Sequence, residues 1–261
     1  MRNFIQFLFV IGHALFFDMA FSENIELRNT TDDMVVIPSG KFKMGCNRFG
    51  LMHGAPEHLV YLNQFMIDRF EVTNKRFEEI IPDHKLRRSR LSSCDECPVT
   101  NVSWYEAVDY CYLTGKTLPT EAQWEKSAGN GDGCAFPWGS DFDPIANEAR
   151  GGLEIKDKSV PVGSYPPNMY GVYDMGGNVW EWVSDWMASG YPVSQKIIDP
   201  KGPSSGIMKV RRGGAYSDNI IAMATGYRDW SHPSSRFFSD IGFRCTINVK
   251  GEFSNGLTTQ D

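Results

Sequence analysis

From residue 130 to about residue 245 the sequence shows almost no helical periodicity, and this stretch constrains the fold more than any other feature. It is filled with Gly, Pro, Asn, Asp and Trp. Long irregular segments inside compact domains are usually functional, or are held by metal ions or disulfides. We therefore expect this half of the chain to be fixed by something other than regular backbone ladders.

Three short helices are expected before that stretch, over residues 73–82, 103–115 and 120–129. A proline stops the first helix. The sequences SWYE and TEAQ are capping boxes that open the second and third helices, and a glycine closes each of these two. Residues 34–45 predict two short strands around a Ser-Gly turn, and residues 58–70 predict a second pair of strands with alternating hydrophobicity.

Residues 1–22 are interpreted as a secretory signal peptide. Arg2 supplies a short positive region, residues 4–17 form an apolar run, and AFS offers small residues at a cleavage site. The run is too short for a membrane span, and no other segment of the sequence is long and apolar enough. Asp18, directly after the run, leaves an uncleaved anchor as the alternative.

We expect a polar linker over residues 23–33, one folded domain over residues 34–248 and a flexible tail over residues 249–261. The mature chain then has no membrane span. It is exported, to a bacterial periplasm or to the outside of the cell.

The composition argues against nucleic acid as a partner. The chain has 261 residues, of which 41% are hydrophobic, and this is enough for one sizeable core or two small domains. Its formal charge is −6. A nucleic-acid-binding protein would present a basic face, whereas the one clustered basic run, KLRRSR at residues 85–90, is interpreted as a solvated loop.

Six cysteines in an exported chain favour disulfides over free thiols. Cys94 and Cys97 have C-x-x-C spacing. A zinc site would need a second ligand pair at suitable spacing, and a thioredoxin-like redox site would need a βαβ setting, and the sequence indicates neither. A structural bridge is the favoured interpretation.

The segment YGVYDMGGNVWEWVSDW, residues 170–186, combines oxygen donors with glycines. Asp174 and Glu181 supply carboxylates, Asn178 supplies a side-chain carbonyl, and the double glycine lets main-chain carbonyls turn inward. Oxygen-only ligands on a flexible loop suit Ca²⁺ rather than zinc or copper. The alternative is a tryptophan-rich core loop with acids on the surface.

Eight motifs occur in an order that resembles a known family. They are PSGKFKMG, IDRFEVTN, PVTNVSWYEAVDYC, KTLPTEAQWEKSA, FPWG, VPVGSYPPNMYGVYDMGGNVWEW, RRGGAY and IGFRC. Together they look like the sulfatase-modifying-factor domain of the formylglycine-generating-enzyme family, over about residues 34–247. The resemblance implies a single α+β domain related to C-type lectins, with little regular secondary structure and with bound calcium.

The resemblance also implies particular ligands and one disulfide. The family's better-defined calcium site falls on Asp174, Gly177, Val179 and Glu181, of which Gly177 and Val179 would bind through backbone carbonyls. A second calcium site would begin near Asn147 and Glu148 and continue around Glu154, in a loop that is shorter here. A disulfide that recurs in relatives maps onto Cys111 and Cys245, whereas the other four cysteines are left without assigned partners.

Active members of the family oxidise a cysteine of a client sulfatase to formylglycine, with a copper-binding cysteine pair placed just after a double glycine. In this chain Asp218 and Met223 stand at the two cysteine positions, and Ala215 replaces the active enzymes' serine. Neither a carboxylate nor a thioether can form a mixed disulfide, and no cysteine lies between Cys134 and Cys245. The resemblance therefore predicts a pseudoenzyme that makes no formylglycine.

Copper and iron are not expected as cofactors. An Asp218–Met223 copper site would be poor in geometry and softness. Other branches of the family use iron held by three histidines, but this chain has no helical H-x-x-x-H pair. We interpret its histidines as solvated or hydrogen-bonded.

The residues expected at the replaced site are acidic and aromatic, and they are Tyr216, Asp218, Asn219, Tyr227, Arg228, Asp229 and Trp230. Such a cleft suits a peptide or a sugar. We expect a binding or accessory protein for a partner enzyme or polypeptide. The alternative is an oxidoreductase or other enzyme of an exported maturation pathway, acting through a non-cysteine group such as Asp218.

Overall fold

The computed structural model describes residue 31 and residues 33–47, 54, 56–129, 135–139, 157–191 and 198–249. The expected signal peptide lies outside the described residues, as do most of the expected linker and all of the expected tail except Val249. Among the described residues, no helix has both the length and the apolar content needed to cross a bilayer.

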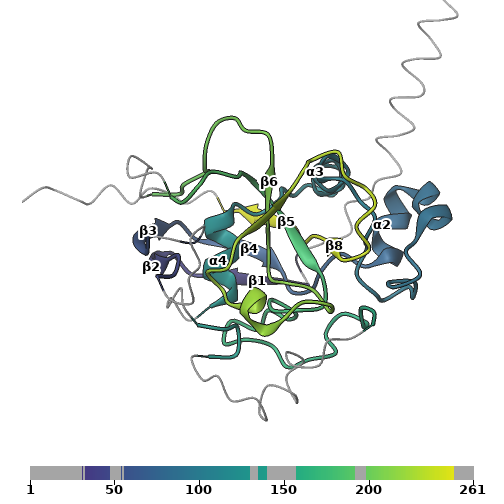
Figure 1. Cartoon of the computed structure of the whole chain (residues 1–261), viewed down its shortest axis with the longest axis horizontal. Helices are drawn as coiled ribbons and strands as arrows, with labels where there is room; N and C mark the ends of the chain where they lie inside the picture. Colours follow the sequence, from purple (N-terminus) through teal and green to yellow (C-terminus); the bar gives the residue numbers. More distant parts are fainter. Residues whose placement is uncertain are drawn as a thin grey trace, which may run out of the picture. The chain divides into compact units, whose positions relative to one another are not determined.

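The three expected helices are confirmed, with the expected caps (Figure 1). The Ser103 hydroxyl accepts from the Glu106 backbone while the Glu106 carboxylate accepts from the Ser103 backbone, and Thr120 and Gln123 form the same reciprocal pair. The basic run differs from expectation, because its first half belongs to a 3₁₀ helix. The helical elements are α2 (Asn74–Ile80), η1 (Pro82–Arg87), α3 (Trp104–Leu113), α4 (Glu121–Ala128) and η2 (Ile220–Met223).

The four expected N-terminal strands are present, but the two strands of each expected pair do not pair with each other. They are β1 (Met34–Ile37), β2 (Gly40–Met44), β3 (His58–Leu62) and β4 (Phe65–Asp68). Strand β2 pairs with β3, whereas β1 pairs with β4, which also pairs with β9 (Thr246–Asn248). The chain is therefore closed on itself, because its first and last described strands lie in one sheet.

The second half is more regular than the sequence predicts. It contains β5 (Trp180–Trp186), β6 (Lys209–Arg212), β7 (Asp229–Ser231) and β8 (Ile241–Gly242), which form a sheet in the order β7-β6-β5-β8. The expectation that backbone ladders play no part there is wrong. These strands are short, and β5 shifts register against β6 between Trp182 and Trp186, so they leave little periodicity in the sequence.

Strand β5 joins two hydrophobic cores. Successive side chains of a strand point to opposite faces, so Val183 packs with Trp124 and Met175 on one side, while Trp182 packs with Phe243 on the other. The mixture of short helices and small sheets confirms the expected α+β fold.

Two disulfides are described. Cys111 of α3 is bonded to Cys245 across 134 residues, as the resemblance implies. Cys94 is bonded to Cys97, which agrees with the structural bridging favoured for these cysteines and supplies a pairing that the sequence left open.

Candidate functional site

The loop expected to bind calcium and the turn that carries the replaced cysteine positions are in direct contact. Gly177, at φ 93°, donates its backbone N–H to the Gly213 carbonyl at 2.9 Å, and Tyr216 donates to the Asn178 carbonyl at 3.0 Å. Asn178 itself has a φ of 58°, in the left-handed region that asparagine tolerates better than most residues. The two sequence motifs therefore form one structural unit.

Three buried carboxylates gather beneath this loop. Asp174 and Glu181 were expected there, and Glu71, from the segment after β4, joins them. The Asn178 amide donates to Glu71 Oε2 at 2.7 Å, while the Asn178 Oδ1 accepts from the backbone of Val160 at 3.0 Å. Asn178 thus positions Glu71 rather than offering its carbonyl to a ligand.

One guanidinium lies among these carboxylates. Arg244 donates to both oxygens of Glu181 at 2.7 Å, and the Trp124 indole also donates to Glu181, at 2.9 Å. Asp174 accepts at Oδ2 from the Gly163 backbone at 2.6 Å. The cluster therefore holds three carboxylates against one guanidinium, which leaves an excess of buried negative charge if all three ionise.

The pKa values of two of these carboxyl groups are raised by their burial and by their negative neighbours. Burial raises the pKa of Asp174 to about 6, although the Gly163 hydrogen bond and the charge of Arg244 oppose this, and Glu181 raises it further. Burial, with the charges of Asp174 and Glu181, also raises the pKa of Glu71 well above its usual range. Either protons or a cation must compensate these groups near neutral pH.

The donor set fits a hard cation. Oδ1 of Asp174 and Oε1 of Glu71 are buried and have no hydrogen-bond partner among the described residues. Glu181 would have to share an oxygen between the cation and Arg244. The described residues hold no group of three His, Cys, Asp or Glu side chains suited to a metal, so backbone carbonyls such as those of Gly177 and Val179 would have to complete the shell. Asn147, Glu148 and Glu154 lie outside the described residues.

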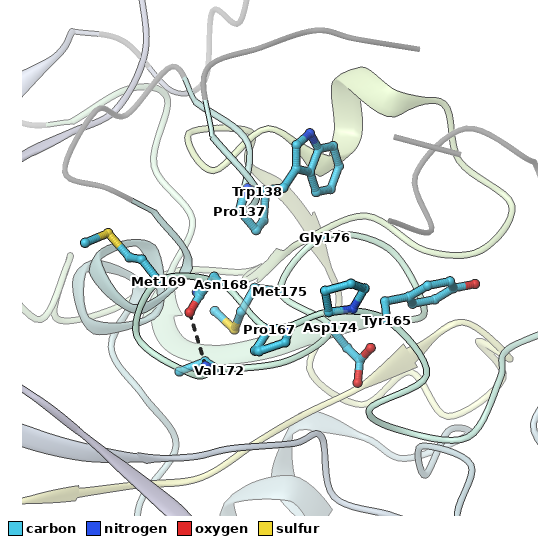
Figure 2. Close-up of a pocket in the computed structure, with 11 residues that line it drawn as sticks. Pro137, Trp138, Tyr165, Pro167, Asn168, Met169, Val172, Asp174, Met175 and Gly176 are labelled. Carbon is cyan, nitrogen blue, oxygen red and sulfur yellow. Dashed lines mark hydrogen bonds between the residues drawn. The ribbon is translucent and has the colours of Figure 1, made fainter. Parts of the chain in front are cut away.

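A cavity of about 250 Å³ lies on the outer side of the same loop, lined by Pro137, Pro167 and Met175 among others (Figure 2). Figure 2 shows the Asp174 carboxylate on the side away from Trp138. This agrees with the burial of Asp174 and with its bond to Gly163. Asp174 thus lines this cavity while its carboxylate bonds to the Gly163 backbone beside the buried cluster.

In the turn after the double glycine, polar side chains form hydrogen bonds with the backbone of the same segment. Asp218 Oδ2 accepts from the Ala215 backbone at 3.0 Å, and Asn219 Oδ1 accepts from the Ile221 backbone at 3.0 Å and so caps η2. Met223 is 3% exposed and packs with Phe136. At the two positions that the family resemblance assigns to cysteines, the chain therefore has a turn-forming carboxylate and a core thioether.

A second cavity, of about 480 Å³, opens beside this turn. Its lining contains both apolar and polar residues, and comprises Leu91, Asp157, Tyr216, Ser217, Phe237, Phe238, Ser239 and Asp240. Phe237 is 93% exposed, and the Tyr216 hydroxyl lies 3.3 Å from that of Ser239. Exposed aromatic rings beside a cavity of this size are typical of a ligand site.

Arg211 interacts with several acids, one of which, Asp240, lines this cavity. Arg211 bonds Asp229 at 2.6 Å and stacks on the Trp180 ring at 4.7 Å. Burial raises the pKa of Asp240, Arg211 lowers it, and the charges of Asp218 and Asp229 raise it. The cavity edge is therefore rich in acidic groups.

Arg228 lies elsewhere than the sequence suggests. Its guanidinium donates to both oxygens of Glu121 in α4, at 2.5 and 2.8 Å, and stacks on Tyr191 at 4.4 Å. It thus anchors α4 in the core and lines neither cavity. Of the other expected cleft residues, Tyr216 alone lines the larger cavity, while Tyr227 and Trp230 are half-buried nearby in the chain.

Sequence reasoning missed several members of both sites. Glu71 and Arg244 lie within the motifs IDRFEVTN and IGFRC, where their charges inside apolar segments were the available signal. Phe237 and Phe238 are an apolar pair in a polar segment, and nothing local connects them with Tyr216. These two rings line the same cavity as Tyr216 only because of how the chain folds between the two segments.

The family model described as the sulfatase-modifying factor enzyme 1-like domain matches residues 21–249. A bovine protein named formylglycine-generating enzyme is 30% identical over 280 residues, covering 82% of this chain and 74% of the relative. A bovine protein named inactive C-alpha-formylglycine-generating enzyme 2 is also 30% identical, over 85% of this chain and 90% of the relative. Overall identity therefore does not separate active from inactive relatives.

Other matches extend the comparison. The serine/threonine-protein kinase pkn1 of Chlamydia caviae is 33% identical over 87% of this chain, but the chain spans only 40% of that relative's length. Among solved structures, Treponema denticola variable protein 1 superimposes with a TM-score of 0.70 at 25% identity, over 82% of this chain and 94% of the other.

Proposed function

The chain belongs to the sulfatase-modifying factor enzyme 1-like family, and we propose that it is a member that binds a polypeptide without generating formylglycine. The proposed binding site is the cavity beside Tyr216 and Phe237. The protein then serves as an accessory to a partner enzyme or polypeptide.

The state of the two cysteine positions carries this proposal. Cysteine oxidation by the family's chemistry needs two thiolates that can bind Cu(I) and exchange with a substrate thiol. Asp218 is held in its own turn by Ala215, and Met223 is buried with Phe136. Neither side chain can supply a thiolate, and restoring the chemistry would require changes to both a turn and a core.

The chemistry of the larger cavity supports a polypeptide as the occupant. Phe237, Phe238 and Leu91 offer apolar contacts, while Asp157 and Asp240 offer negative charge. A segment with an apolar side chain next to a lysine or arginine complements both the apolar residues and the negative charge. The enzyme alternative would use Asp240, because its raised pKa at the cavity suits a general acid or base.

We propose, further, that the carboxylate cluster binds calcium. Asp174 and Glu181 would contribute carboxylate oxygens, and Gly177 and Val179 would contribute backbone carbonyls. The buried, unpartnered Oδ1 of Asp174 supports this assignment. The ion would neutralise the excess charge around Arg244 and tie the loop to β5, so its role is structural.

An exported location is part of the same proposal. Its support is the pair of described disulfides, because such bonds persist in oxidising compartments and are rare in the cytosol.

Binding and turnover are tested together with a fluorescent peptide that carries the sulfatase modification motif. We expect saturable binding by fluorescence anisotropy and no aldehyde in the peptide by mass spectrometry. Phe237→Ser should weaken binding about tenfold, since aromatic anchors dominate such contacts. Tyr112→Ser, at an aromatic that is 78% exposed outside the cavity, is the matched control. Formylglycine in the peptide, or equal effects of the two variants, would contradict the proposal.

Calcium binding is tested by melting the protein with chelator and with added Ca²⁺. We expect Ca²⁺ to raise the melting temperature of the wild type and to have no effect on Asp174→Ala. Asp109→Ala, at an exposed acid of α3, should keep the wild-type response. A wild-type melting temperature that is indifferent to both chelator and Ca²⁺ would refute the calcium site.

A further inference from the structure

The Cys94–Cys97 disulfide differs from the other described bridge in its accessibility. Cys94 is exposed and Cys97 is 5% exposed, whereas Cys111 and Cys245 are both fully buried. Attack on a disulfide requires a thiolate to reach one of its sulfurs. Of these four cysteines, only Cys94 is presented to an incoming thiol, with its partner behind it.

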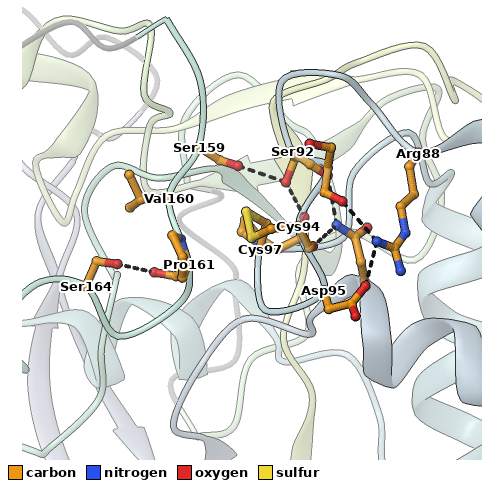
Figure 3. The surroundings of a disulfide bond; sticks show 12 residues. Arg88, Ser92, Cys94, Asp95, Cys97, Ser159, Val160, Pro161 and Ser164 are labelled. Carbon is orange, nitrogen blue, oxygen red and sulfur yellow. Dashed lines mark hydrogen bonds and ion pairs between the residues drawn. A yellow bond between two sulfur atoms is a disulfide. The ribbon is translucent and has the colours of Figure 1, made fainter.

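Hydrogen bonds hold the loop around this bridge independently of the sulfurs (Figure 3). The Asn74 side chain donates to the Cys94 carbonyl at 2.9 Å, and its backbone donates to the Cys97 carbonyl at 2.9 Å. The backbone of Lys75 donates to the Asp95 carbonyl at 3.0 Å, and that of Val162 donates to the Glu96 carbonyl at 2.9 Å. The bridge closes a loop of only three residues' separation, so it restricts the unfolded chain far less than the bridge across 134 residues does. The loop should therefore keep its shape when the bridge opens.

The two acids between the cysteines are each paired with a cation. Arg88 bonds Asp95 at 2.8 Å and also donates to the Ser93 carbonyl, and Lys75 lies 3.8 Å from Glu96. These pairs offset the negative charge that would otherwise repel an approaching thiolate. Figure 3 shows Arg88 and Asp95 beside the bridge.

We propose that Cys94–Cys97 is a thiol–disulfide exchange site whose substrate is a polypeptide dithiol. A client thiolate attacks the Cys94 sulfur, the Cys94–Cys97 bond breaks, and its electron pair leaves on the Cys97 sulfur, which takes a proton from solvent. The second client thiolate then attacks the client sulfur of the mixed disulfide and releases Cys94, which is protonated in turn. The client dithiol is oxidised to a disulfide and this chain is reduced to a dithiol. Exchange with a low-molecular-weight disulfide restores the bridge.

The position of the loop fits a polypeptide client. Leu91 lines the larger cavity, and Cys94 lies three positions further along the chain. Consecutive Cα atoms are about 3.8 Å apart, so the Leu91 and Cys94 Cα atoms are at most about 11 Å apart. Only the choice of a polypeptide client rests on the proposed function. Exchange with a small thiol does not require the cavity, so exchange at Cys94–Cys97 and polypeptide binding at the cavity can be refuted independently.

The test uses the full chain in glutathione buffers of increasing reducing strength. Alkylation followed by peptide mass spectrometry reports each bridge separately. We expect Cys94–Cys97 to be reduced at least about tenfold faster than Cys111–Cys245, with the circular dichroism unchanged, because an accessible sulfur reacts selectively. Equal rates, or reduction of Cys94–Cys97 only on unfolding, would overturn the proposal.

Two single variants form the matched pair. Cys97→Ser leaves the exposed Cys94 thiol, which should trap oxidised glutathione as a mixed disulfide. Cys94→Ser leaves the buried Cys97 thiol, which should react at least about tenfold more slowly. Client oxidation is measured with a reduced dithiol peptide: the wild type should convert one equivalent, and Tyr112→Ser, at an exposed residue outside the cavity, should retain exchange with glutathione. Equal trapping by the two variants, or no oxidised peptide, would contradict the assignment.

Discussion

Removing the Cys111–Cys245 bridge should lower the free energy of unfolding far more than removing Cys94–Cys97. In the chain-entropy model the cost grows with the logarithm of loop length. The separation of 134 residues gives about 5 kcal/mol and the separation of 3 residues gives about 2 kcal/mol. Both Cys111 and Cys245 are also fully buried in the core with Phe243, so a double alanine variant adds a small cavity cost.

The assay is chemical unfolding of both double alanine variants without reductant. Tryptophan fluorescence monitors the transition and gives the free energy of unfolding. Because small domains have about 5–15 kcal/mol of stability in total, the variant of Cys111 and Cys245 should be marginally folded. The variant of Cys94 and Cys97 should unfold cooperatively at a slightly lower denaturant concentration. Equal losses for the two pairs would refute the loop-length argument, and so would a loss below about 2 kcal/mol for the long loop.

Three further predictions concern the fold. Burial and the charge of Glu121 raise the pKa of Asp185 to about 7, so the folded state holds a proton that the unfolded chain releases above about pH 4. The free energy of unfolding should fall as pH rises from about 4 to about 7, and Asp185→Asn should reduce that slope in unfolding curves measured across this range. Gly242→Ala should cost about 1–3 kcal/mol in chemical unfolding, because its Cβ would lie 2.6 Å from the Val99 carbonyl oxygen. Ser103→Ala and Thr120→Ala should each cost about 1 kcal/mol through the lost cap, and a change below a few tenths in both would argue against the capping boxes.

The helices and the order of the motifs were predictable, and the pairing of strands was not. The hydrophobic pattern of a strand does not indicate which strand it pairs with. The sequence therefore suggested that β1 pairs with β2 and β3 with β4, whereas β1 pairs with β4 and β2 with β3. The four-stranded sheet of the second half was missed for a related reason. Its strands have two to seven residues, too few to show a period against the surrounding glycines and prolines.

The residues of the candidate sites were likewise only partly predictable from the sequence. Asp174 and Glu181 could be proposed from one loop, and the family resemblance predicts from the sequence alone that Asp218 and Met223 stand at the cysteine positions. Glu71 could not be placed beside them, because it reaches Asn178 across 107 residues.

The sequence by itself determined the family and the helix caps. Each depends on residue identity, or on residues three positions apart that any helix brings together. Only the tertiary structure decided that Arg244 reaches Glu181 across 63 residues, that Met223 is buried, and that Cys94 faces solvent while Cys97 does not. Burial and long-range contact are properties of the packed chain, because they depend on which surfaces other segments cover.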